Sequence, residues 1–113
     1  MPSVHLTRRA ARDLRDIHAH STVRWGQARA DTYLGDLYAV FARIAANPGL
    51  GRLRARRAAP FLMVPSGRHF VVYDLLADRL MILTVLHQVR DIERIIAALE
   101  PEFLSEIAAL RGA

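Results

Sequence analysis

The stretch FLMVPSGRHFVVYDLLADRLMILTVLH, residues 61–87, decides the fold class. It contains three runs that are rich in β-branched and aromatic residues: 61–64, 69–75 and 80–87. The turn-forming segments PSG and ADR separate these runs. Links this short join antiparallel neighbours, so the stretch predicts a three-stranded antiparallel meander. The third run is apolar on both faces, which predicts a strand that is central in the sheet or covered.

The residues before this stretch repeat at helical spacing. A first helix is predicted after Thr7, which suits an N-cap, by the apolar stripe Ala10, Leu14, Ile17 and Ser21. A second helix is predicted by the series Ala30, Tyr33, Leu34, Leu37, Phe41, Ile44 and Ala45, and Asn47-Pro48-Gly49 ends it. The short link around Trp25 and Gly26 predicts an antiparallel helical hairpin. A short apolar run, residues 4–6, predicts a strand ahead of it.

The residues after the meander predict a last helix from Asp91, which Pro101 restarts as an amphipathic extension over 101–113. We therefore expect one α+β domain over residues 1–113. An N-terminal strand and helical hairpin would pack on a three- to four-stranded antiparallel sheet, with a C-terminal helix. A length of 113 residues leaves no room for a second independent core.

Composition excludes several classes of function. The chain has no cysteine, so disulfides, thiolate nucleophiles and Cys-ligated metals are excluded. All 16 basic residues are arginine, which excludes lysine-based chemistry. The N-terminus lacks the pattern of a secretory signal, and the longest apolar run, 80–86, is far shorter than the roughly 20 residues of a membrane helix. These features predict a cytoplasmic location.

The basic charge is concentrated in the first half of the chain. Residues 1–60 carry eleven arginines against four acidic residues, whereas residues 61–113 carry five against seven. Residues 49–60 have little periodicity and predict an exposed loop that presents Arg52, Arg54, Arg56 and Arg57. Such a loop could simply keep the protein soluble, but it also suits capture of an acidic, disordered partner segment.

One set of residues could form a nuclease-like site: Arg68, His69, Tyr73, His87 and Arg90. Cleavage needs a base, an acid and cations for the phosphate, and alternation places His69 and Tyr73 on one strand face. In the structural alternative, Tyr73 packs in the sheet, His87 hydrogen-bonds the following turn, and Arg90 pairs with Asp91 or Glu93.

Other candidates have mainly structural interpretations. His18 and His20 would point about 200° apart on a helix and cannot share one ion, so no metal and no cofactor is expected. Trp25 could anchor a partner, although an aromatic residue here more often seals a helix junction. Tyr33, Leu37, Tyr38 and Phe41 suit either the core or a groove that faces a partner.

Several motifs together resemble the ParE/RelE toxins. The segment TRRAARDLRDI (7–17) is similar to the opening of that family, and Trp25-Gly26 with Ala30 and Tyr33 is similar to its W-G-x-x-x-A-x-x-Y link. The segments NPGLGR (47–52), GRHFVVY (67–73) and LHQVRD (86–91) resemble its later motifs in the same order. The resemblance covers nearly the whole chain and implies the fold described above.

Departures from the pattern favour the ParE branch over the RelE branch. RelE-type ribonucleases typically use Lys and Arg on the phosphate and a Tyr after the final Arg, whereas this chain has no Lys and continues Asp91, Ile92, Glu93, Arg94. Asp74 also stands where family members often carry Arg. The resemblance therefore implies the toxin of a type II toxin–antitoxin system that inhibits DNA gyrase by binding, with no catalytic residues of its own.

The resemblance also implies partners and contact residues. A ParD-like antitoxin would neutralise the toxin in a hetero-oligomer, and operator DNA would be bound only through the antitoxin. The residues expected to bind antitoxin are Tyr33, Leu37, Tyr38, Phe41, Arg52, Arg54, Arg56 and Arg57. The residues expected to bind the target are Arg68, Arg90 and Arg94. The alternatives are a RelE-type ribosome-dependent mRNA endoribonuclease that uses the nuclease-like set, and a non-toxic family member.

Overall fold

The computed structural model describes residues 1–53, 62–88, 98, 101, 102, 105 and 108. Its elements in chain order are β1 (Ser3–Leu6), α1 (Arg8–Trp25), α2 (Gln27–Ala46), a short 3-10 helix η1 (Pro48–Leu50), β2 (Arg52–Leu53), β3 (Leu62–Ser66), β4 (His69–Leu76) and β5 (Arg79–His87). The predicted helix from Asp91, most of the extension over 101–113, and Arg54, Arg56 and Arg57 of the predicted loop lie outside these residues.

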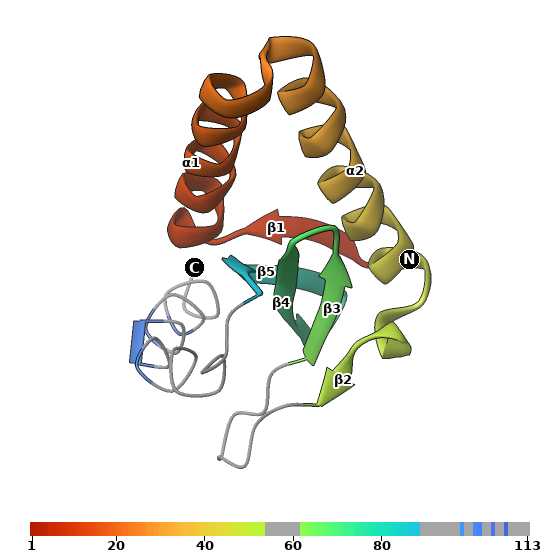
Figure 1. Ribbon diagram of the computed structural model, residues 1–113. Coiled ribbons are helices and arrows are strands. Elements are labelled where there is room, and N and C mark those ends of the chain that lie inside the picture. Colours follow the sequence, from red (N-terminus) through yellow and green to blue (C-terminus); the bar gives the residue numbers. More distant parts are fainter. Residues whose placement is uncertain (54–61, 89–97, 99–100, 103–104, 106–107, 109–113) are drawn as a thin grey trace.

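The strands form one sheet in the order β1-β5-β4-β3-β2 (Figure 1). The predicted antiparallel meander β3-β4-β5 is confirmed. The sheet as a whole is mixed rather than purely antiparallel, because β1 pairs with β5 in parallel, with Val4 opposite Leu80. After β1, the two helices carry the chain to the opposite edge of the sheet, where β2 lies. The chain then returns through β3 and β4 to β5, which pairs with β1. Thus β5 is central, as predicted, and Leu80–Val85 are buried along it.

Two local features adjust the predicted strands. β3 ends at Ser66 rather than before Pro65, because the turn to β4 needs only two residues. Gly67 adopts a φ of 56° in this turn. The pairing of β4 with β5 shifts after Val72, which lies opposite Thr84, whereas Tyr73 lies opposite Ile82. This bulge changes the alternation of β5, so Val85 joins Leu80 and Ile82 in the core cluster.

Thr7 is the N-cap of α1, as predicted. Its hydroxyl oxygen accepts a hydrogen bond from the backbone N–H of Ala10 (3.0 Å) and donates one to the carbonyl of Leu83 (2.7 Å). The cap therefore satisfies a free amide of the helix and also attaches the helix start to the central strand. Because Thr7 is buried, this bond is formed away from water.

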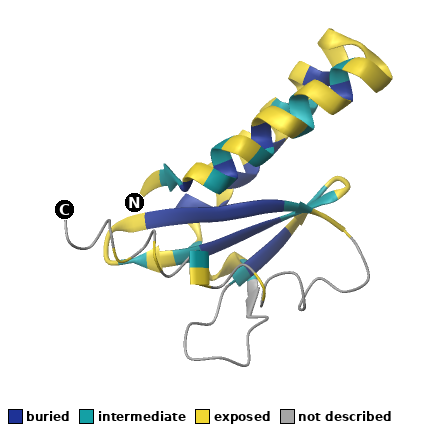
Figure 2. Cartoon of the chain, turned by 90° about the vertical axis from the view of Figure 1, so that its left-hand side faces the viewer, coloured by how far each residue is buried: buried dark blue, intermediate teal, exposed yellow. Residues whose placement is uncertain are grey.

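The two helices form the predicted hairpin and lie on one face of the sheet (Figures 1 and 2). Gly26, with a φ of 90°, is the single residue between them, and this end of the hairpin projects beyond the sheet (Figure 2). Ala10, Leu14 and Ser21 on α1 are buried, which confirms the predicted stripe. None of the helices in the described part of the chain is long and apolar enough to cross a membrane.

The core lies between the hairpin and the sheet. Leu37 and Phe41 of α2 have exposed fractions of 0% and 2% and pack in the same cluster as Val71, Tyr73 and Ile82. For Leu37 and Phe41 the structure therefore favours the core over a partner-facing groove. Tyr38 differs from both, because 48% of its surface is exposed.

Candidate functional site

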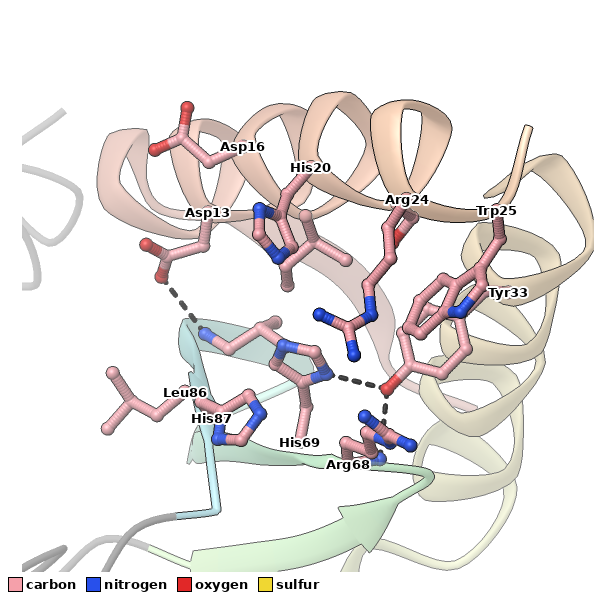
Figure 3. A pocket seen from close by; sticks show the side chains of 13 residues that line it. Asp13, Asp16, His20, Arg24, Trp25, Tyr33, Arg68, His69, Leu86 and His87 are labelled. Atoms are coloured by element: carbon pink, nitrogen blue, oxygen red, sulfur yellow. Dashed lines mark hydrogen bonds between the residues drawn. The ribbon is translucent and has the colours of Figure 1, made fainter. Parts of the chain in front are cut away.

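A pocket of about 380 Å³ lies between α1 and the adjoining ends of β4 and β5 (Figure 3). We call it the α1–sheet pocket. The residues that line it are Asp13, Asp16, Ile17, His20, Ser21, Arg24, Trp25, Tyr33, Arg68, His69, Val85, Leu86 and His87. Its size lies within the range of small ligand sites, roughly 300–1,000 Å³.

Two arginines meet at the single tryptophan of the chain. The guanidinium carbons of Arg24 and Arg68 lie 5.5 and 5.6 Å from the Trp25 ring centroid, within the range of cation–π attraction. Arg24 is in the last turn of α1, and Arg68 is in the β3–β4 turn. Both side chains are exposed, and neither forms an ion pair with another residue that the structure describes.

Tyr33 and His69 form the wall between α2 and β4. The Tyr33 hydroxyl accepts from the backbone N–H of Arg68 (3.0 Å) and lies 2.6 Å from His69 Nδ1. The hydroxyl also lies within donating distance of the Ser66 carbonyl (3.4 Å), and the tautomer of His69 decides which member of the Tyr33–His69 pair donates. A side chain at Gly67 would clash here, since an added Cβ would lie 2.7 Å from the Tyr33 ring.

His69 is held neutral at physiological pH. Burial lowers its pKa from 6.5 to about 4, and the neighbouring His87 adds to this effect. The rings of His69 and His87 are 5.3 Å apart at their centroids, edge to face. The pair is formed because the two residues are directly opposite each other in the β4–β5 register.

The opposite end of the pocket is acidic. The Thr84 hydroxyl and the backbone N–H of Val85 (3.0 Å) both donate to Asp13 Oδ2. Burial raises the Asp13 pKa above its usual value, and these two hydrogen bonds oppose that rise. Asp16 is exposed one turn further along α1. The pocket therefore has an acidic end and a basic, aromatic end.

The structure separates the nuclease-like set. Arg68, His69 and His87 come together at the α1–sheet pocket, but Tyr73 is fully buried elsewhere. Its hydroxyl donates to the carbonyl of Pro48 (2.5 Å) and accepts from the backbone N–H of Gly51 (2.8 Å). Tyr73 thus packs in the sheet, as in the structural alternative, and its hydroxyl is engaged by these two hydrogen bonds. Arg90 lies outside the described residues.

The other predicted contact residues are dispersed. Tyr33 is half-buried in the pocket wall, whereas the exposed Tyr38 packs edge to face on Phe41 at 5.5 Å. The backbone of Arg52 pairs with Met63 at the sheet edge. The side chain of Arg52 lies outside the described part of the chain, as does Arg94. His18 contacts Asp31 across the hairpin, with Nε2 2.7 Å from Oδ1.

Sequence reasoning missed the contribution of α1 to the pocket. From the sequence, Asp13, Asp16 and Arg24 receive no binding role, His20 is considered only as a metal ligand, and Trp25 has both a partner-anchor and a helix-junction interpretation. A signal was present, because residues 13, 16, 17, 20, 21 and 24 follow one another at helical spacing and form a single face. That face carries charged residues beside the apolar stripe.

Comparisons with known proteins agree with this architecture. A family model described as "ParE toxin of type II toxin-antitoxin system, parDE" matches residues 4–92. Toxin ParE1 of Caulobacter vibrioides is 39% identical over 88 residues, which are 78% of this chain and 91% of that protein. Toxin ParE1 of Mycobacterium tuberculosis is 32% identical over 72 residues, or 63% of this chain and 74% of that protein.

A solved structure supports the same fold. The structure described as "Chromosomal ParDE TA system from P. aeruginosa" matches with a TM-score of 0.68 at 22% identity and covers 79% of this chain and 98% of that chain. The order of elements, the mixed sheet and the family match over residues 4–92 agree with one another. The chain therefore belongs to the family of ParE toxins of type II toxin–antitoxin systems.

Proposed function

We propose that this toxin inhibits DNA gyrase by binding, without chemistry of its own, and that a ParD-like antitoxin neutralises it. The observation that carries the proposal is the family match over residues 4–92. The position of Tyr73 supports binding over RNA cleavage, because its hydroxyl is buried and already bonded to Pro48 and Gly51. Both proteins would act in the cytoplasm, where gyrase meets the chromosome.

The antitoxin would bind along the hairpin. A second hollow of about 330 Å³ lies between α1 and α2, and its lining includes Leu6, Leu14, Leu34 and Tyr38. An amphipathic antitoxin helix could place its apolar face there. Leu37 and Phe41 would support this surface from the core, and Tyr33 would hold the neighbouring turn. Toxin and antitoxin would form a hetero-oligomer that reaches operator DNA through the antitoxin.

The arginines of the predicted loop would complete the antitoxin contact. Arg52, Arg54, Arg56 and Arg57 fit the acidic tail expected of such a partner, because long-range attraction speeds the capture of a disordered segment. Arg68, Arg90 and Arg94 are the residues we propose for the target. Of these three, Arg68 is the one whose surroundings the structure describes.

The test is a gyrase supercoiling assay with the purified toxin, run with and without the antitoxin encoded beside it. We expect inhibition by the toxin alone and recovery of supercoiling when the antitoxin is added in equal amount. If gyrase stays fully active with the toxin in clear excess, the gyrase proposal is wrong. A toxin that inhibits gyrase equally with and without the antitoxin would contradict the proposed neutralisation.

A further inference from the structure

We infer that the α1–sheet pocket is the target-recognition site of the toxin, and that it receives an acidic side chain beside an apolar side chain of a protein. The inference rests on the proposed function for the identity of the target. It goes further by assigning Arg24 and Trp25 to recognition and by naming the chemistry of the surface that binds there.

The basic end of the pocket is built for a carboxylate. Arg24 and Arg68 approach one indole ring at 5.5 and 5.6 Å, and two like charges held so near a common ring favour an anion between them. A guanidinium group that contacts an aromatic ring keeps N–H donors available for a planar oxyanion. Neither guanidinium is neutralised by an ion pair within the chain as described. The site therefore presents charge that a partner can neutralise.

The histidines add hydrogen-bonding groups at the same end. His69 Nδ1 lies 2.6 Å from the Tyr33 hydroxyl, and the His69 ring forms part of the pocket wall. His87 lies directly against it, 5.3 Å between ring centroids, and is exposed. Tyr33 also holds the Arg68 backbone at 3.0 Å, so the turn that carries this arginine is fixed before any partner binds. A site organised in advance loses less entropy on binding.

The remaining lining selects a protein over a nucleic acid. Ile17, Val85 and Leu86 supply apolar surface between the two ends of the pocket. Asp16 lies eight residues before Arg24 on α1, about 12 Å along the helix axis. A nucleic-acid backbone, which carries a negative charge at every phosphate, would be repelled at that end. A protein surface can place an acid at Arg24 and Arg68 and apolar or basic groups toward Asp16.

The residue types at the basic end of the pocket are those that dominate binding energy in protein interfaces. Tryptophan, tyrosine and arginine are enriched among such residues, and the pocket combines Trp25, Tyr33, Arg24 and Arg68. Trp25, the single tryptophan of the chain, is 38% exposed. Burial of this indole by a partner would remove that exposed area from water.

The experiment compares gyrase inhibition by the full-length toxin and its Arg24→Glu, Arg68→Glu and Trp25→Ala variants. The matched control is Arg29→Glu, which makes the same charge change at an exposed position of α2 outside the pocket. Circular dichroism and thermal unfolding verify that each variant folds. If a glutamate variant does not fold, Arg24→Gln and Arg68→Gln take its place. Direct binding to gyrase without DNA is measured in parallel.

We expect the three pocket variants to weaken inhibition and binding by roughly 10-fold to 100-fold, as truncation of central interface residues commonly does. Arg29→Glu should inhibit like the wild type. Folded pocket variants that inhibit gyrase fully would overturn the inference while leaving the proposed function intact. Pocket variants that inhibit gyrase fully but are no longer neutralised by the antitoxin would also overturn the inference. They would assign the pocket to antitoxin binding. If the wild type itself leaves gyrase active, the proposed function fails, and the inference fails with it.

Discussion

Tyr33 shows how one hydroxyl group can position a binding surface. On α2, it contacts three groups of the β3–β4 turn region: His69 Nδ1 at 2.6 Å, the Arg68 amide at 3.0 Å and the Ser66 carbonyl at 3.4 Å. The ring also occupies the space that a side chain at Gly67 would need. The position of Arg68 therefore depends on a residue that is 35 positions earlier in the chain.

Replacing Tyr33 by phenylalanine should destabilise the protein by about 1–3 kcal/mol, because the Arg68 amide and His69 Nδ1 lose a partner while the packing remains. The free energy of unfolding, measured by urea denaturation, tests this. Tyr38→Phe is the control, since its exposed ring packs on Phe41 and its hydroxyl has no hydrogen bond with the residues that the structure describes. Equal stability of the two variants would contradict the role given to Tyr33.

His69 should make stability depend on pH. Burial, with His87 beside it, lowers its pKa from 6.5 to about 4, so the unfolded chain binds more protons between these values. The stabilising contribution of neutral His69 to the free energy of unfolding is therefore fully present above pH 6.5. The free energy of unfolding should fall as the pH drops toward 4. Urea denaturation at several pH values measures this slope.

The variant His69→Gln isolates the contribution of this residue, because glutamine keeps a hydrogen-bonding group near Tyr33 but does not titrate. We expect its stability to vary less between pH 6.5 and 4 than that of the wild type. His20→Gln, at an exposed position of the same pocket, serves as the control. An unchanged slope in His69→Gln would show that other groups cause the pH dependence.

At the scale of elements, the helical hairpin needs a glycine at position 26 but not at position 35. Gly26 connects α1 and α2 with a φ of 90°, a conformation that L side chains rarely adopt. Gly35 lies within α2, is exposed, and has no atom that would touch an added Cβ. An added Cβ at Gly26 also meets nothing within 4 Å. The two positions therefore differ in backbone conformation and not in the contacts of an added side chain.

We predict opposite effects for the same substitution. Gly35→Ala should stabilise the protein by about 0.5–1 kcal/mol, because alanine restricts the unfolded chain and suits a helix. Gly26→Ala should destabilise it by about 1 kcal/mol or more, because the junction requires a positive φ. Thermal or urea unfolding of the two single variants measures both effects. A stabilising Gly26→Ala would mean that the helices can join through another conformation.

At the scale of the whole molecule, the charge distribution predicts how the partner is captured. The net charge is +5, and the first 60 residues carry eleven arginines against four acids. Long-range attraction between this half and an acidic antitoxin would raise the association rate, and salt would screen that attraction.

The association rate with the antitoxin should therefore fall by roughly tenfold or more between 50 and 500 mM NaCl, while the dissociation rate changes much less. Biolayer interferometry at several salt concentrations measures both rates. A dissociation rate that carries most of the salt effect would show that close ion pairs, rather than long-range attraction, dominate the complex.

The sequence by itself determined the two helices of the hairpin, the meander and the family. Local chemistry specifies these features: Thr7 caps α1, apolar residues repeat every three to four positions along both helices, and short turns force the last three strands to be antiparallel. The buried stripe of α1 and the central position of β5 follow from residue periodicity, and the structure confirms both.

Only the tertiary structure decided how distant segments meet. The parallel pairing of β1 with β5 depends on the path of the chain through two helices, and the bulge after Val72 depends on pairing between strands. The α1–sheet pocket joins Arg24 from the end of α1, Tyr33 from α2 and Arg68 from a turn. The same packing encloses Tyr73 and separates it from His69. Local sequence cannot specify these contacts, because each depends on the relative placement of elements far apart in the chain.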